Sequence, residues 1–172
     1  MGKVVLKLGA DISTDIIYPG RFMATVLPTE TPQFAFVDDA EFNKKLKAKQ
    51  IEPGSFIVAD KNFGCGSSRE QAASCLVGWG LKVIAKNFSR IFLQNSINVG
   101  LYMVICPNIE ANEGDELEIE NGPSTGLGAS KVVNKTSGKS FDIVPLPKAR
   151  QAIIDAGGLI PYTKKMIMDG KK

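Results

Sequence analysis

The sequence contains no histidine among its 172 residues. Histidine is the side chain that most often transfers protons near neutral pH, so any acid–base chemistry here must use serine, aspartate, glutamate, lysine, tyrosine or cysteine. A Ser–His–Asp hydrolase built from this chain alone is therefore excluded.

Cysteine is also scarce. Cys65, Cys75 and Cys106 are the only three, and no two of them form a C-x-x-C pair. An odd number of widely spaced cysteines argues against a disulfide framework, and against a zinc or iron–sulfur site held by this chain alone. A reducing cytoplasm is the expected compartment.

Charge and hydropathy exclude two further classes of partner. The net charge of +3 is too small and too dispersed to indicate nucleic-acid binding. No apolar run approaches the roughly 18–20 residues of a membrane span, and the N-terminus lacks the pattern of a signal peptide. We therefore expect a cytoplasmic protein of one domain that binds neither nucleic acid nor membrane.

The middle of the chain alternates between two patterns. Apolar strands are predicted at 55–60, 81–85 and 101–106, with helices at 68–78 and 88–99 between them. This order predicts a parallel β-α-β-α-β unit whose ligand site lies at the carboxyl ends of the strands. The flanking segments predict a strand at 4–8, a helix at 38–50 capped by Asp38 or Asp39, a strand at 115–120, a flexible loop at 122–128, a hairpin at 131–135 and 140–144, and helices at 148–156 and 160–168.

Residues 21–37 show little periodicity, and Pro28 and Pro32 interrupt any helix. A functional, mobile loop is one interpretation of this segment. A packed irregular segment under Phe34 and Phe36 is the other, and the pattern leaves both open.

The most informative stretch runs from Lys61 to Ala72. Gly64 and Gly66 permit a tight bend and a close approach to a ligand. Ser67 or Ser68 is predicted to cap the following helix, with Glu70 or Gln71 closing a capping box. A helix N-terminus attracts anions.

Arg69 would then stand in the first helical turn, where an acidic residue is favoured. Its charge requires either a bound carboxylate or phosphate, or a nearby acidic side chain, and the spacing does not choose between them.

Three groups of residues resemble one known family. They are Asp11 to Pro19, Asn62 to Glu70 with its Gly-Cys-Gly-Ser-Ser-Arg-Glu run, and Arg90-Ile91-Phe92 followed by Asn95, Asn98 and Gly100. Together they resemble the small subunits of 3-isopropylmalate dehydratase, of the aconitase superfamily, and the likeness covers essentially the whole chain.

The resemblance implies an α/β fold: one swivelling β/β/α domain over residues 1–172, with a parallel β-α-β core and an additional β-hairpin region. A mobile substrate-specificity loop would span about residues 20–37. The implied activity is a hydro-lyase that isomerises 2-isopropylmalate and 3-isopropylmalate by dehydration and rehydration in leucine biosynthesis.

The family also implies a partner and a cofactor. Such a chain is active only with its large subunit, in a heterodimer or heterotetramer, and the large subunit holds a [4Fe–4S] cluster. This chain itself is expected to bind no metal.

Carried onto this sequence, Ser67 matches the serine that removes the substrate proton, and Arg69 matches the arginine that binds a substrate carboxylate. The amides of Gly66 and Ser68 would stabilise a serine alkoxide. Cys65 becomes a small packing residue near the site, and Cys75 and Cys106 are expected in the core.

Substrate choice is expected in the loop after Pro19-Gly20. Homoaconitase-type relatives carry a Tyr-Leu-Arg-Thr run there, and the matching residues here are Phe22, Met23, Ala24 and Thr25. Ala24 replaces the arginine, which predicts a pocket for an alkyl group. Arg21, just before this run, remains a candidate partner for a carboxylate.

Two departures from the family are Gln71, where many members have histidine, and Gln94, where many have arginine. They keep other 2-hydroxy diacids open as substrates: citramalate (methylmalate), 2,3-dimethylmalate or homoaconitate. A non-catalytic anion-binding module is the alternative from another class.

Overall fold

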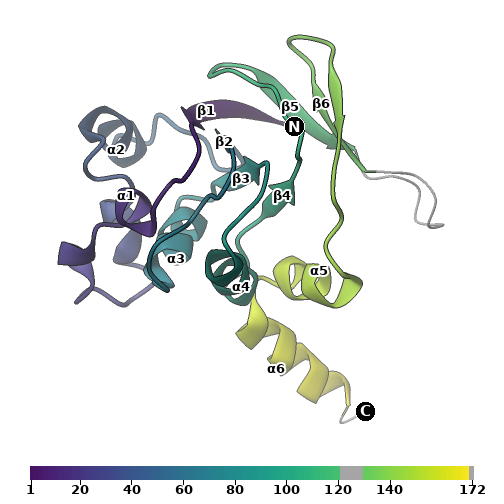
Figure 1. The fold of residues 1–172 in the computed structure, drawn as a ribbon. Coiled ribbons are helices and arrows are strands. Elements are labelled where there is room, and N and C mark those ends of the chain that lie inside the picture. Colours follow the sequence, from purple (N-terminus) through teal and green to yellow (C-terminus); the bar gives the residue numbers. More distant parts are fainter. Residues whose placement is uncertain (121–129, 171–172) are drawn as a thin grey trace.

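A computed structural model describes residues 1–120 and 130–170, and the loop expected at 122–128 lies outside them. One mixed sheet has the strand order β4-β3-β2-β1-β5-β6-β7 (Figure 1). Its strands are β1 (Gly2–Leu8), β2 (Phe56–Ala59), β3 (Lys82–Ala85), β4 (Met103–Ile105), β5 (Glu116–Glu120), β6 (Lys131–Asn134) and β7 (Ser140–Asp142).

The first four strands run parallel, which confirms the predicted β-α-β-α-β unit and adds β1 to it. Both faces of this half of the sheet are covered. Ile57 and Ala59 of β2 join one buried cluster and Phe56 and Val58 join the other, as the alternation of side chains along a strand requires. Strands of a parallel sheet that is buried on both faces have continuous apolar sequences, and this pattern is why the sequence predicts β2.

Helices α3 (Gln71–Gly78) and α4 (Arg90–Val99) pack together and cover one face of the parallel strands (Figure 1). The hydroxyl of Ser89 accepts from the Phe92 amide to begin α4, and Gly100 in the left-handed conformation ends it. The short helix α1 (Thr14–Ile17) and helix α2 (Ala40–Lys47), which Asp39 caps as predicted, precede β2.

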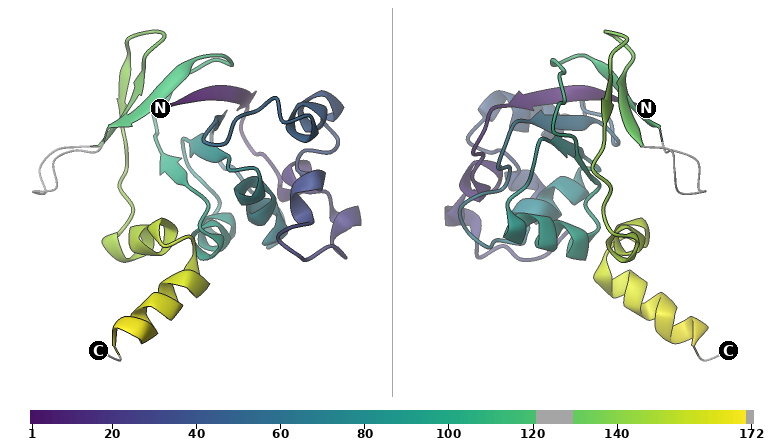
Figure 2. Two further views of the ribbon diagram at one scale, coloured as in Figure 1. Left: turned by 180° about the vertical axis from the view of Figure 1, so that it is seen from behind. Right: turned by 45° about the vertical axis from the view of Figure 1, so that its right-hand side comes forward.

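Strands β5, β6 and β7 form antiparallel pairs, and β5 pairs antiparallel with β1. The predicted hairpin is therefore confirmed. Helices α5 (Lys148–Asp155) and α6 (Leu159–Asp169) follow, and α6 extends away from the body in the views of Figure 2.

The segment predicted to be irregular, residues 21–37, overlaps two 3-10 helices, η1 (Gly20–Phe22) and η2 (Thr31–Phe34). Ala35 and Phe36 after η2 are buried in the core, and Trp79 donates to the Pro32 carbonyl oxygen at 2.6 Å. The second half of the segment is thus a packed irregular segment, whereas residues 26–30 are exposed.

Gly64 provides a test of how tightly this fold is built. It has a φ of +78°, and a Cβ there would lie 2.1 Å from Cγ of Phe92. We expect Gly64→Ala to lower the free energy of unfolding by about 2–4 kcal/mol, since backbone strain and overpacking add. Denaturant unfolding measures this.

Gly138→Ala is the matched control, because Gly138 has a φ of +73° but no atom within 4 Å of its Cβ position. It should cost only the backbone part, about 1–2 kcal/mol. Equal losses in the two variants would contradict the close contact with Phe92.

Candidate active site

The predicted ligand edge is where β1 and β2 end side by side. Their pairing continues past the strands: the amides of Gly64 and Cys65 donate to the Ile12 carbonyl oxygen at 2.7 and 3.0 Å. The Thr14 amide donates to the Cys65 carbonyl oxygen at 2.7 Å. The loop that carries Ser67 is therefore held against the segment that begins α1.

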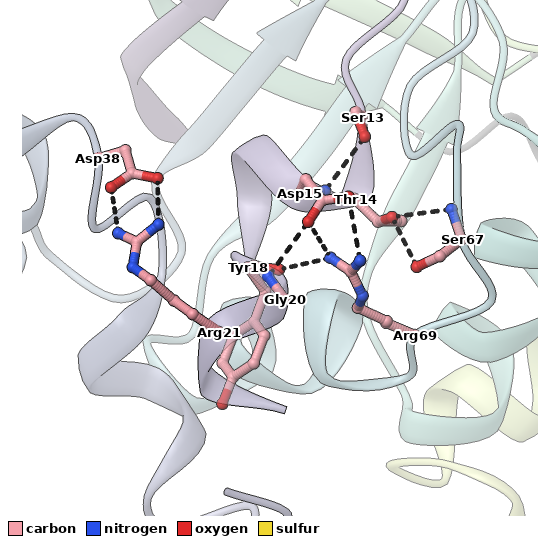
Figure 3. A network of polar contacts seen from close by, with 9 residues as sticks. All are labelled: Ser13, Thr14, Asp15, Tyr18, Gly20, Arg21, Asp38, Ser67 and Arg69. Atoms are coloured by element: carbon pink, nitrogen blue, oxygen red, sulfur yellow. Dashed lines mark hydrogen bonds and ion pairs between the residues drawn. The ribbon is translucent and has the colours of Figure 1, made fainter. Parts of the chain in front are cut away.

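Ser67 lies directly against Thr14 (Figure 3). The Ser67 amide donates to Thr14 Oγ1 at 3.1 Å, and the hydroxyl oxygens of the two residues are also 3.1 Å apart. Thr14 is fully buried, while Ser67 is half-buried and so accessible from one side. Sequence reasoning did not find Thr14.

The predicted helix cap at Ser67 or Ser68 is wrong. Helix α3 begins at Gln71, and Glu70 at its N-cap makes no side-chain capping bond. Ser67 bonds to Thr14, the Ser68 carbonyl oxygen accepts from Nδ2 of Asn95 at 2.9 Å, and both residues precede the N-cap of α3. Arg69 therefore precedes the helix instead of standing in its first turn.

Both glycines of the loop have positive φ, as the sequence suggested. Their close approaches are to the protein itself. A Cβ on Gly66 would lie 2.9 Å from Oγ of Ser13, and the Gly64 carbonyl oxygen accepts from Oγ of Ser89 at 2.6 Å. The loop is thus fixed from α4 on one side and from α1 on the other.

Arg69 pairs with Asp15 (Figure 3). Nη1 contacts Oδ1 at 2.5 Å and Nη2 contacts Oδ2 at 3.0 Å, while Nη1 also donates to the Tyr18 carbonyl oxygen at 3.2 Å. Of the two explanations that the sequence left open for this charge, a nearby acidic side chain is the one observed. Asp15 lies 54 residues away in the sequence and was not predicted.

The ion pair sets the charge of Asp15. Its hydrogen bond with Arg69 holds the pKa of the Asp15 carboxyl below its usual range, with a further contribution from the Gly20 amide. The Arg69 side chain is only 13% exposed, so its cationic group is kept at a fixed place beside Ser67.

The predicted specificity residues begin beside this arginine, because a Cβ on Gly20 would lie 3.1 Å from Nη2 of Arg69. The hydroxyl of Tyr18 lies 3.0 Å from the Phe22 carbonyl oxygen and 3.3 Å from that of Thr25. Burial raises the pKa of Tyr18, so the hydroxyl stays neutral and holds the turn.

Within that turn, the residues differ in exposure. The Phe22 ring stacks on Phe34 with centroids 4.2 Å apart, and Met23 and Ala24 are exposed. Arg21 forms an ion pair with Asp38 and lies over the Phe22 ring, so its charge already has a partner.

The cysteines are dispersed. Cys75 and Cys106 are buried as predicted, and burial raises the pKa of Cys106 to about 11. Cys65 is half-buried in the Ser67 loop. Within residues 1–120 and 130–170, no three His, Cys, Asp or Glu side chains are grouped to hold a metal ion.

Comparison with known proteins places the chain in a family. A model of the aconitase C-terminal domain matches residues 10–108. The isopropylmalate/citramalate isomerase small subunit of Methanocaldococcus jannaschii is 42% identical over 97% of this chain and 95% of its own length. A 3-isopropylmalate dehydratase small subunit of Archaeoglobus fulgidus is 44% identical over 92% of each chain.

A crystal structure of 3-isopropylmalate dehydratase from M. jannaschii superimposes with a TM-score of 0.82, at 37% identity, covering 99% of this chain and 98% of that one. The chain belongs to the family of 3-isopropylmalate dehydratase small subunits. The α/β fold expected from the family is confirmed.

Gln71 and Gln94, the two predicted departures from the family, have different partners. Nε2 of Gln71 is 3.5 Å from the Met23 carbonyl oxygen, which links α3 to the predicted specificity turn, residues 21–25. Gln94 donates to Asn98 within α4 at 3.0 Å.

No helix among the described residues of this family member has the length and apolar character needed to cross a membrane.

The Arg69–Asp15 pair has a testable pH dependence. Because the pKa of Asp15 is lowered, the pair stabilises the fold above the usual carboxyl pKa and is lost as pH falls through the lowered value. We expect Asp15→Asn to reduce the free energy of unfolding at pH 7 by about 1 kcal/mol or less, since Asp15 is partly solvated.

That difference from the wild type should be constant above about pH 5 and should be lost as the pH falls below the usual carboxyl pKa and through the lowered pKa of Asp15, as measured by denaturant unfolding. Asp169→Asn on α6 removes an exposed carboxylate that has no ion pair among the described residues, and as the control it should leave the free energy of unfolding nearly unchanged. A difference for Asp15→Asn that persists unchanged at low pH would contradict the ion pair.

Proposed function

We propose that this chain is the small subunit of a 3-isopropylmalate dehydratase, a hydro-lyase that interconverts 2-isopropylmalate and 3-isopropylmalate with its large subunit. The observation that carries the proposal is the placement of Ser67 and Arg69, two residues apart, in a loop fixed by Thr14 and Asp15 at the carboxyl edge of the sheet. The names of the relatives support the same activity.

Ser67 is the proposed base. As an alkoxide, its Oγ takes a proton from the carbon beside a substrate carboxylate and becomes a neutral hydroxyl, and the electron pair of that C–H bond forms the double bond as hydroxide leaves the neighbouring carbon. On rehydration Oγ returns the proton. A serine alkoxide is costly in water, so donors must be preorganised around it. Among the described residues the Gly66 and Ser68 amides have no hydrogen-bond acceptor, which supports their assignment to this task.

Arg69 is the proposed carboxylate ligand. A guanidinium has five N–H donors, and Asp15 and Tyr18 take three of them from the Nη1 and Nη2 end. The edge formed by Nε and Nη2 is left, and Nε has no partner among the described residues. This edge suits bidentate binding of a second carboxylate. Nε is buried, so a ligand there must displace the atoms that cover it.

The large subunit is the proposed partner, in a heterodimer or heterotetramer. The dispersed cysteines of this chain do not fit an iron–sulfur cluster, so we assign the cluster to the large subunit. When bound there, a [4Fe–4S] cluster supplies a Lewis acid for the substrate hydroxyl.

An alkyl-bearing 2-hydroxy diacid is the proposed substrate class. Phe22, Met23 and Ala24 supply no charge, and Arg21 is paired with Asp38. This favours isopropylmalate over homoaconitate, which carries an additional carboxylate. The name of the M. jannaschii relative makes citramalate the second candidate, and 2,3-dimethylmalate has the same alkyl character.

A non-catalytic anion-binding module is disfavoured by the Asp15 pair. Asp15 balances the charge of Arg69 and leaves only its buried Nε edge, so a free phosphate, which lacks the further contacts that a substrate would make with the large subunit, should bind weakly. The chain alone should therefore bind inorganic phosphate poorly.

Ser67→Ala tests the proposed base. Mixed with a large subunit that carries an intact cluster, the wild-type chain should restore hydration of 2-isopropylmaleate. In the variant kcat should fall by about 10²–10⁴-fold, as expected for loss of a general base. Ser140→Ala, an exposed serine of β7, is the control and should retain activity. Full activity of Ser67→Ala would remove the base assignment.

Ala24→Arg tests the specificity turn. A charge at this position should lower kcat/KM for isopropylmalate and raise it for homoaconitate, each by about 10-fold or more, because an alkyl group next to an unpaired guanidinium is unfavourable. Thr29→Arg adds the same charge at an exposed position of the same segment and should leave selectivity unchanged. Unchanged selectivity in Ala24→Arg would exclude residues 21–25 from substrate choice.

A further inference from the structure

The contact between Thr14 and Ser67 contains more than a structural hydrogen bond. Thr14 Oγ1 lies 3.1 Å from both the amide nitrogen and the hydroxyl oxygen of Ser67. The amide can only donate, so it occupies a lone pair of Thr14 Oγ1. The single hydrogen of the Thr14 hydroxyl is not used by this bond, so it can be donated to Ser67 Oγ.

The direction of that hydrogen follows from the protonation state of Ser67. In the neutral pair either hydroxyl can donate. Once Ser67 has lost its proton it can only accept, and Thr14 is then the donor. Hydrogen bonds to a charged oxygen are stronger than those between neutral groups, so this contact favours the alkoxide over the alcohol.

Thr14 is well placed to act in this way. It is fully buried, and in the part of the chain that the structure describes its hydroxyl has no partner besides Ser67. Its backbone is fixed as well, because its amide donates to Cys65 and its carbonyl oxygen accepts from Tyr18. The donor therefore needs no rearrangement when charge develops on Ser67.

We propose that Thr14 is a positioning residue for Ser67, whose hydroxyl orients the serine and stabilises its deprotonated form by donating a hydrogen bond to Oγ. This inference rests on the proposed function, in which Ser67 is the base, and it adds the residue that makes a serine usable as a base in a chain without histidine.

The test compares three variants of the chain reconstituted with a cluster-bearing large subunit. Thr14→Val replaces the hydroxyl with a methyl group and keeps the shape of the side chain. Thr14→Ala removes both the hydroxyl and the γ-methyl group. Thr14→Ser keeps the hydroxyl and removes only the methyl group. We expect kcat to fall by about 10²-fold in Thr14→Val and Thr14→Ala with KM little changed, as for loss of one donor to an oxyanion. Thr14→Ser should restore most of the activity.

The pH profile of kcat separates this role from a merely structural one. Losing the donor makes the alkoxide harder to form, so the acidic limb of the profile should move to higher pH in Thr14→Val and Thr14→Ala and return in Thr14→Ser. The other ionisable side chains on the elements packed against Ser67 are unchanged in all variants: Asp11, Asp15, Cys65, Arg69, Glu70, Cys75 and Arg90.

The outcomes distinguish this inference from the proposed function. If Ser67→Ala abolishes activity while Thr14→Val and Thr14→Ala keep the wild-type kcat and pH profile, the role of Thr14 is refuted and the base assignment stands. If Ser67→Ala is fully active, the proposed function fails first. Thermal denaturation of each variant shows whether it is folded. A loss of activity that follows only a loss of folded protein, with an unshifted pH profile, also refutes the proposal.

Discussion

The site depends on hydrogen bonds that continue the β1–β2 pairing beyond the two strands. Ile12 accepts from two successive amides of the Ser67 loop, and Thr14 returns a bond to Cys65. Parallel neighbours end at the same edge of a sheet, so two segments far apart in sequence leave that edge together. Adjacent residues of one segment then meet alternate residues of the other: Thr14 contacts Ser67, and Asp15 contacts Arg69.

That arrangement explains how a loop without regular structure can be well ordered. Irregular backbone near a core must find partners for its polar groups. Here they come from α1 and from α4, through Ser89 to Gly64 and Asn95 to Ser68. The glycines allow the loop to approach Phe92 and Ser13, so the packing of α4 and the position of Ser67 are parts of one arrangement.

Much of this could be predicted from local sequence patterns. Continuous apolar strands, the Ser89 and Gly100 helix ends, and the loop around Gly64 and Gly66 all have signals within a few residues. The start of α3 has no such local signal. Ser67 and Ser68 have the residue type of helix caps, but Ser67 bonds to Thr14 and Ser68 to Asn95. The partner of Arg69 was equally hidden, since nothing local connects it with Asp15. A polar Ser13-Thr14-Asp15 run after the first strand was the available signal.

The long sequence separations of these contacts bear on how the chain acquires its site. Thr14 and Ser67 are 53 residues apart, and Asn95 and Ser68 are 27 apart. Each pairing closes a long loop of the chain. The chain loses conformational entropy on closing the loop before the new contacts stabilise it, and this slows folding. When β2 has emerged from the ribosome but α4 has not, the nascent chain lacks the α4 residues that hold the Ser67 loop. The arrangement around Ser67 is therefore expected late in folding, after the parallel strands have assembled.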